Sequence, residues 1–344
     1  MTSTDKLLVK EYQVDYIDQF MTVDGKKRID DYVELTTDLA NKYRESQGIT
    51  TPLHEIPRPM KIDKNNWGVE YLMNKAPTFE EWLDTSALAT TVETLYDPIN
   101  TRLKSGQKLD PFFSEFLQNL EDAIGIRARS YILTMLMAEN VREKENWLSL
   151  ACGNALPVLR AAEAAKNKPM ITLVDFNFDN LRYARKIAKA RGQNNLISEH
   201  MFRDLTHKKG FQKPQHGRTI LASLLFRKRP VISFSGIKTN FYDRIESCGF
   251  VEYLPPKAAA LYLKRVFDLL APGGVFIFDS YNVEHPQRDF TEGVIQWPLV
   301  KFRNQQETID IIEESGVPIM DNTVDVYPAP NKVCTVYKIR KPLN

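Results

Sequence analysis

The sequence predicts an α/β protein in which a helical segment precedes a doubly wound, mostly parallel sheet. Three observations support this fold class. From about residue 141 onward, short apolar runs alternate with amphipathic stretches, as strands and helices do when they follow one another. Residues 1 to about 140 instead carry apolar side chains at helical spacing. A glycine and two aspartates follow three successive strand candidates, at the edge where such sheets bind ligands.

Length and composition indicate a globular chain of about two domains. The sequence has 344 residues, 43% hydrophobic and 26% charged, and its net charge of +2 excludes no class of partner. No apolar stretch reaches the roughly 20 residues of a membrane-spanning helix, and the N-terminus lacks the apolar core of a secretion signal. Three cysteines without metal-ligand spacing indicate a reducing environment and no structural zinc. We therefore expect a cytoplasmic protein without a membrane span or a metal site.

The first half is expected to form a helical N-terminal domain, residues 1–140. Apolar residues recur every three or four positions in RIDDYVELTTDLANKY (28–43) and again in DPFFSEFLQNLEDAI (110–124). Between them, the three prolines of ITTPLHEIPRPMK (49–61) predict an extended connector. Such stripes are typical of helices that pack on one another, and the alternative is a helical lid over a ligand site.

The second half, residues 141–344, is expected to alternate strands and helices. Pro157 is tolerated because it falls in the first turn of the first helix, and Gly192 ends the second. The expected strands are 147–151, 171–176, 195–202, 241–248, 274–281, 324–329 and 334–339, and the expected helices are 156–167, 177–192, 255–274 and 304–316.

The turn after the first strand is the expected ligand loop. Gly153 lacks a Cβ, so it permits positive φ and a close approach of a ligand to the start of the next helix. Asp175 ends the second strand, where a carboxylate can accept hydrogen bonds from ribose hydroxyls. The alternative role for Asp175 is a helix N-cap, for which Asn177 and Asp179 compete. Asp204 follows the third strand, where it can accept from an exocyclic amine.

With these motifs, residues 141–344 resemble the class I S-adenosylmethionine (SAM)-dependent methyltransferases. LSLACGNA stands at the glycine-rich loop of that family, LVDFNFDNLRYAR at its acidic second-strand motif and MFRDL at its third-strand acid. FYDRIESCGFVEYLPPKAAALYLKRVFDLLAPGGVFIFDSY matches the fourth strand through the fifth, and the last two strands suit the family's antiparallel hairpin. The resemblance implies a seven-stranded Rossmann-like sheet. It also implies methyl transfer from SAM to a small molecule, with S-adenosylhomocysteine as the product.

The resemblance also implies the cofactor contacts. Gly153 would lie against the methionine part, Asp175 would hold the ribose, and Asp204 would bind the adenine amine. Cys248 and Gly249 would line the floor near the sulfonium. The full expected set is Ser149, Ala151, Cys152, Gly153, Asn154, Asp175, Phe176, Asp204, Leu205, Cys248 and Gly249.

The ligand loop departs from the family pattern at three positions. Ser149 stands where the family usually has an acid, and it can bind the methionine part only more weakly than a carboxylate would. Ala151 and Ala155 replace two of the loop glycines. We expect both alanines to keep negative φ, since alanine then costs little in a turn.

Two segments bear on the methyl acceptor. Residues 205–240 form a basic insertion without Asp or Glu, either a solvated surface or a capture site for an anion. GVIQWPLVKFRNQQETIDIIEESG (293–316) resembles the bacterial methyltransferases that make 3-hydroxy fatty acid methyl esters. We expect a small anionic acceptor with an apolar part, methylated on a carboxylate oxygen that needs no general base. Candidate substrate contacts are Glu252, Tyr253, Tyr281, Asn282, Trp297 and Arg303, and the catalytic candidates among them are Tyr253, Tyr281 and Arg303.

Three other functions share parts of this pattern. A dinucleotide dehydrogenase has the same sheet, but the lone glycine and the lack of a persuasive catalytic His or Tyr-Lys arrangement argue against it. A non-catalytic SAM-binding or partner-binding module would explain the altered loop. A nucleic-acid methyltransferase would use the basic insertion, although CGFV stands where amino-directed enzymes have (D/N)PP(Y/F/W).

Overall fold

The structure is a computed structural model. The predicted cofactor contacts Asp204 and Leu205, and the basic insertion up to residue 233, lie outside its described residues. The described residues are 7–21, 24–55, 64, 66–85, 89–202, 234, 236–297 and 300–343.

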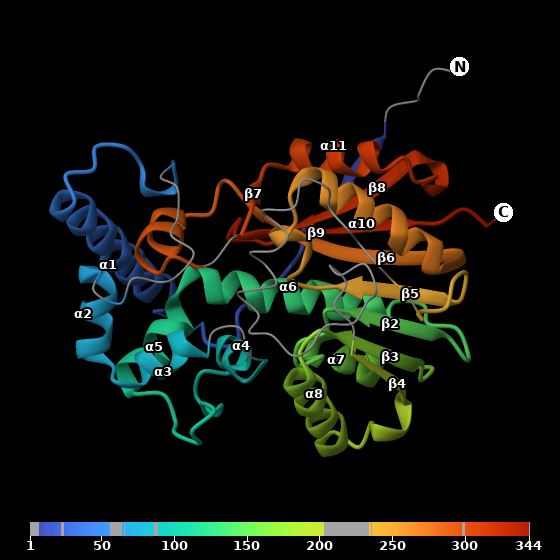
Figure 1. Cartoon of the computed structure of the whole chain (residues 1–344), viewed down its shortest axis with the longest axis horizontal. Coiled ribbons are helices and arrows are strands. Elements are labelled where there is room, and N and C mark those ends of the chain that lie inside the picture. The colour runs from blue at the N-terminus through green and yellow to red at the C-terminus, as the bar shows by residue number, and fades with distance from the viewer. Residues whose placement is uncertain are drawn as a thin grey trace.

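A nine-stranded sheet forms the centre of the molecule (Figure 1). Its strands are β1 (Leu8–Glu11), β2 (Asn146–Leu150), β3 (Met170–Asp175), β4 (Ile197–Phe202), β5 (Tyr242–Ser247), β6 (Leu270–Asn282), β7 (Phe302–Arg303), β8 (Thr323–Pro328) and β9 (Cys334–Arg340). The order is β1-β8-β9-β6-β5-β2-β3-β4, and β7 pairs with β6. Strands β4, β3, β2, β5 and β6 are parallel, whereas β9 is antiparallel to β6 and β8. The predicted seven-stranded, doubly wound sheet with a terminal hairpin is therefore confirmed, with β1 and β7 as additions.

Helices cover both faces of this sheet (Figure 1). They are α6 (Glu121–Ala138), α7 (Leu156–Ala164) and α8 (Phe178–Ala190) on one face, and α10 (Pro256–Leu269) and α11 (Gln305–Ser315) on the other. Successive side chains of a strand point to opposite faces. Accordingly Phe276 and Phe278 of β6 pack with α10 and α11, while Ile277 packs with α6 and α7. Two buried faces explain why these strands read as continuous apolar runs.

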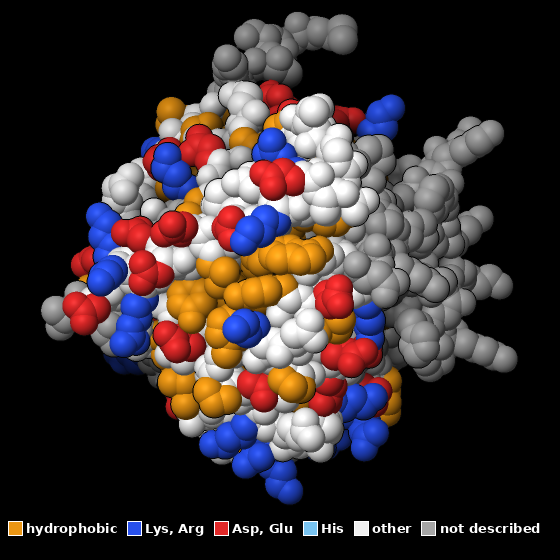
Figure 2. Space-filling view, turned by 90° about the vertical axis from the view of Figure 1, so that its left-hand side faces the viewer, with side chains coloured by type: hydrophobic (Ala, Val, Ile, Leu, Met, Phe, Trp, Pro, Cys, Tyr) orange, Lys and Arg blue, Asp and Glu red, His pale blue; other side chains and the backbone are white. Residues whose placement is uncertain are grey.

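A helical layer lies at the end of the sheet where β6 ends, on the left of Figure 1. It consists of α1 (Gly25–Ser46), α2 (Trp67–Lys75), α3 (Thr78–Asp84), α4 (Ala89–Tyr96) and α5 (Pro111–Asn119). Phe113 and Phe116 of this layer share a core with Tyr281 and Phe290, which come from the end of β6 and the segment after it. The layer therefore covers the carboxyl ends of the parallel strands. Its outer face carries an apolar patch surrounded by charged side chains (Figure 2).

The predicted boundary near residue 140 does not separate the helical layer from the sheet. β1 pairs in parallel with β8, so the chain enters the sheet before it builds the helices. Helix α6 packs on the sheet, where Ile132 and Met137 share a core with Trp147. The predicted stripe 110–124 is two helices, because Leu120 is extended (φ −69°, ψ 124°) and ends α5 before α6 begins.

In the described part of the chain, no helix is long and apolar enough to cross a membrane. In the same ranges, no group of three or more His, Cys, Asp or Glu side chains is arranged to bind a metal ion.

Candidate functional site

The turn between β2 and α7 has the backbone of a glycine-rich loop. Ala151, Gly153 and Ala155 all lie in the left-handed region, with φ of 53°, 53° and 55°. The prediction that the two alanines keep negative φ is therefore wrong. The chain reverses from strand to helix within five residues, and alternate left-handed positions make that turn whether or not they are glycine. An L-residue there costs roughly 1–2 kcal/mol.

Replacing Ala151 by glycine is therefore expected to raise the free energy of unfolding by about 1 kcal/mol, because glycine relieves the left-handed strain. Urea unfolding measures the change. Ala155→Gly should raise the free energy of unfolding less, because this substitution also removes a methyl group that is buried in the core. Ala164→Gly, at an exposed position of α7 with ordinary helical geometry, should instead cost about 0.5–1 kcal/mol. A loss of stability in Ala151→Gly would show that the left-handed backbone carries no strain.

Asp175 joins the ligand loop to the end of the neighbouring strand. Its Oδ2 accepts a hydrogen bond from the Gly153 N–H (2.9 Å), and its Oδ1 accepts from the Asn177 N–H (2.7 Å). Burial raises the pKa of Asp175 to about 6. The N-cap of α8 is Asn177, whose side chain accepts from the Asp179 N–H, so Asp175 is not needed for that role. Among the described residues, a Cβ on Gly153 would meet no atom within 4 Å, so these residues leave room for a ligand beside the loop backbone.

A carboxylate from the adjacent strand faces the position where the sequence has Ser149. β2 and β5 are parallel and place Ser149 opposite Glu246. The buried Ser149 hydroxyl donates to Glu246 Oε1, and Glu246 Oε2 accepts from the Cys248 N–H (2.9 Å). Burial raises the pKa of Glu246 to about 7. A carboxylate therefore lies beside the ligand loop although Ser149 replaces the usual acid.

Arg129 of α6 lies between two carboxylates at the ends of β5 and β6. Its Nη1 is 2.7 Å from Asp279 Oδ2 and 3.3 Å from Glu252 Oε1. Asp279 Oδ1 also accepts from the Gly249 N–H (2.8 Å), which fixes the turn after β5. The exposed fractions of the three side chains are 6% for Arg129, 0% for Asp279 and 2% for Glu252. Burial and the Asp279 carboxylate raise the pKa of Glu252 to about 8 against the opposing effect of Arg129.

An aromatic cavity lies between the helical layer and the segment after β6. Tyr281, whose ring centroid is 5.7 Å from the Arg129 guanidinium, connects it to the charged cluster. Trp297 lines the cavity and donates to the Tyr253 hydroxyl (3.2 Å), and Asp122 is an acidic group in the wall. The free volume is about 30 Å³, room for one or two water molecules, so a larger ligand enters only if the walls separate. The other aromatic walls are Phe79, Trp82, Phe113, Phe116 and Phe290.

Two predicted substrate contacts have other partners. The buried Arg303 guanidinium donates from Nη1 to the Val251 carbonyl (3.2 Å) and from Nη2 to the Leu254 carbonyl. It thus holds the turn after β5, and its planar fork is engaged by backbone. Asn282 donates to the Lys332 carbonyl (3.0 Å) at the surface, on the hairpin side of β6. Neither residue lines the aromatic cavity.

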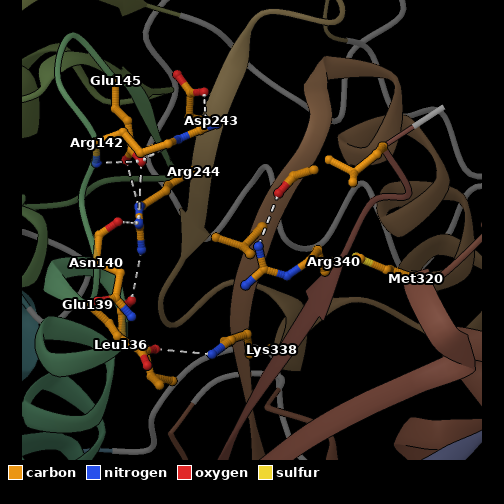
Figure 3. Close-up of a pocket in the computed structure, with 13 residues that line it drawn as sticks. Leu136, Glu139, Asn140, Arg142, Glu145, Asp243, Arg244, Met320, Lys338 and Arg340 are labelled. Atoms are coloured by element: carbon orange, nitrogen blue, oxygen red, sulfur yellow. Dashed lines mark hydrogen bonds and ion pairs between the residues drawn. The ribbon is translucent and has the colours of Figure 1, made fainter.

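A wider cleft, of about 380 Å³, lies at the opposite end of the sheet (Figure 3). Its walls come from the amino ends of β2 and β5, far along the strands from the ligand loop. Glu145 is its central acid and accepts from Arg244 Nε (2.7 Å) and Trp147 Nε1 (2.8 Å), while Arg142 is 2.6 Å from Asp243. Because the charges around Glu145 are paired with one another, we interpret this cleft as a structural ion-pair network.

Sequence reasoning missed Arg129 and Glu246. Glu246 had one visible signal, an acid inside the apolar strand candidate FYDRIESC, but its partner became apparent only from the strand register. Arg129 had none, since it lies in a helix that the apolar pattern did not predict. Cys248 and Gly249 do lie at the end of β5 as expected, beside Glu246 and Asp279.

Comparisons with known proteins agree with this architecture. A possible exported protein from Bordetella parapertussis is similar over 94% of this chain and 99% of its own, with 14% identity and a TM-score of 0.59. The SAM-dependent methyltransferase SibL, in its apo form, is similar over 93% of this chain and 75% of its own, with 14% identity and a TM-score of 0.50. No family model and no curated protein matches the sequence. At this identity the likeness shows the fold alone: the chain has the Rossmann-like fold found in SAM-dependent methyltransferases.

Proposed function

We propose that the protein is a SAM-dependent methyltransferase that acts on a small molecule. The observation that supports this most is the link between the left-handed turn and the second-strand acid, in which Gly153 N–H donates to Asp175. Ser149 and Glu246 supply a second carboxylate site beside the same loop. The fold, shared with SibL, is consistent with this activity.

Bound SAM would supply a methyl group already activated on a positively charged sulfur. The methionine part would lie beside Gly153, and Asp175 would hold the ribose hydroxyls. The turn at Cys248 and Gly249, fixed by Glu246 and Asp279, would form the floor near the sulfonium. The adenine contacts predicted for Asp204 and Leu205 remain predictions.

Asp175→Ala is expected to weaken SAM binding by about 1.5–3 kcal/mol, roughly 10- to 150-fold, because a buried charged hydrogen bond is lost. Titration calorimetry with SAM and S-adenosylhomocysteine measures it. Asp179→Ala is the matched control: this exposed aspartate in the first turn of α8, four residues after Asp175, should leave binding unchanged. Tighter binding of NAD than SAM, or no effect of Asp175→Ala, would contradict the proposal.

For the acceptor, the aromatic walls of the cavity favour an apolar body, which would enter between the helical layer and Tyr281 only if those walls separate. Methylation of a carboxylate, and the narrower resemblance to makers of 3-hydroxy fatty acid methyl esters, remain predictions. Arg303 does not add support for the carboxylate, because its guanidinium binds backbone carbonyls. An assay with tritiated SAM and a panel of phenols, amines, carboxylic acids and RNA separates the alternatives. Label confined to RNA would support a nucleic-acid methyltransferase. SAM binding without methyl transfer would support a non-catalytic SAM-binding module.

A further inference from the structure

We propose that Glu252 is the general base of the methyl transfer, so that the acceptor carries a proton on its nucleophilic oxygen or nitrogen. This inference rests on the proposed function and specifies its acceptor: a hydroxyl or an amine on an apolar body. It differs from the carboxylate predicted from the sequence, which would need no base.

The first argument is the unequal sharing of one buried cation between two buried carboxylates. Asp279 has the short contact to Arg129 (2.7 Å) and a second donor in the Gly249 N–H. Glu252 has the longer contact to Arg129, 3.3 Å through Oε1. Its buried Oε2 has no hydrogen-bond partner among the residues that the structure describes. A buried acceptor without a donor is rare and indicates a missing partner.

The position of Glu252 also suits a general base. A Cβ on Gly249 would come within 3.6 Å of Glu252 Oε1, so Glu252 adjoins the turn proposed to lie under the sulfonium. The next residue, Tyr253, accepts a hydrogen bond from Trp297 in the wall of the aromatic cavity. Glu252 is not itself a wall of the cavity, but its backbone joins the turn at Gly249 to Tyr253, and the proposal places its carboxylate between the cofactor and the acceptor.

The surrounding charges make Glu252 a better proton acceptor than an ordinary carboxylate. Burial and Asp279 of β6 raise its pKa, and Arg129 of α6 and Arg303 of β7 oppose them. Asp122 and Tyr281 also face this region, as do Cys248 and Tyr253. His285 Nε2 and Asp122 Oδ1, 3.5 Å apart, are also buried without a hydrogen-bond partner among the described residues. His285 is a poorer candidate for the base because its Nδ1 already accepts from the Gln287 N–H (3.0 Å).

In the proposed methyl transfer, Glu252 takes the proton that the acceptor loses. The acceptor oxygen or nitrogen forms a bond to the methyl carbon, and its proton passes to the Glu252 carboxylate. The electron pair of the broken carbon–sulfur bond stays on sulfur and cancels its positive charge. Glu252 ends protonated, and it returns the proton to solvent when the products leave.

The test uses the charge difference between SAM and its product, so it needs no known acceptor. The sulfonium of SAM favours ionised Glu252, whereas neutral S-adenosylhomocysteine does not. At pH 7.2, in buffers of different ionisation enthalpy, SAM binding to the full chain should release up to about one proton more than product binding. In Glu252→Gln this difference should vanish while SAM still binds.

Glu121→Gln is the matched control. Burial raises the pKa of this carboxylate too, but it pairs with Asn331 outside the site, so the full proton release should remain. Release that persists in Glu252→Gln, or that disappears in Glu121→Gln, would overturn the proposal. Absence of SAM binding in the unsubstituted protein would refute the proposed function instead.

The rate of methyl transfer is the second measurement. It uses whichever phenol, amine or carboxylic acid is methylated in the tritiated-SAM assay. Glu252→Gln should lower kcat roughly 100- to 10,000-fold and remove the rise of the rate with pH, with little change in SAM affinity. Glu252→Asp should restore part of the rate and the pH dependence, which a merely structural role would not require. Methylation of a carboxylic acid at an unchanged rate in Glu252→Gln would overturn the inference.

Discussion

Arg129→Met is expected to destabilise the fold by about 3–5 kcal/mol near pH 8, because it leaves two carboxylates buried without a cation. Asp279 and Glu252 both lie within 3.3 Å of the Arg129 guanidinium. Methionine fills much of the same space, so the loss of charge, not a cavity, should dominate. Urea unfolding at several pH values measures the effect.

The effect should depend on pH in a defined direction. The pKa of Glu252 is already raised to about 8, so the folded state binds its proton more tightly than the unfolded state does. The stability that this provides is present below the unfolded pKa, about 4.3, and is lost as the pH rises through the folded pKa. Without Arg129, ionised Glu252 is even less stable in the folded protein, so its folded pKa rises further. Between about pH 4.3 and pH 8 both folded proteins hold the Glu252 proton, so this part of the deficit is constant. It should grow above about pH 8, where only the unsubstituted protein releases that proton.

Two further variants test this explanation. Arg265→Met removes an exposed arginine that lies 3.6 Å from Asp268, and it should cost less than about 1 kcal/mol at any of these pH values. Adding Asp279→Asn to Arg129→Met should recover part of the loss, since one uncompensated charge is removed. An equal loss at about pH 7 and at about pH 10 would mean that packing, not charge, determines the contribution of Arg129.

The parts of the fold that could be predicted are those in which neighbouring residues carry the signal. The parallel strands read as apolar runs because both of their faces are buried, and Asp175 could be placed near Gly153 because both follow strands. Helix α6 could not be found in this way. Arg127 and Arg129 are both buried in it, so charged residues occupy positions that a pattern of apolar residues would need.

The parts of the site that could not be predicted depend on register and on contacts distant in sequence. Ser149 alone indicated a weakened cofactor site, but the parallel register of β2 and β5 brings Glu246 to the same place. Arg303 alone suggested a carboxylate ligand, but the turn after β5 offers it two carbonyl oxygens. Both contacts depend on where the backbone of β5 and of the turn after it lies, and no sequence motif describes that position.

A chain that begins at Glu139 is expected not to fold, because it lacks α6. Ile132, Leu133, Leu136 and Met137 of that helix are buried against the sheet. Truncating one such side chain costs about 2–5 kcal/mol, and a domain is stable by only about 5–15 kcal/mol. Removing all four, together with the arginine between Glu252 and Asp279, exceeds that margin. Circular dichroism should show no cooperative unfolding, and calorimetry no SAM binding.

Cutting the chain at the same place after folding should have a much smaller effect. Glu139 and Asn140 are exposed, so a protease site inserted between them can be cleaved in the folded protein. Helix α6 should then stay in place through its buried contacts with α7 and the sheet, and the two fragments should elute together and unfold cooperatively. A fragment 139–344 that folded and bound SAM by itself would restore the predicted boundary near residue 140. If it does not fold, then α6 belongs to the sheet domain, and only α1–α5 can act as a lid.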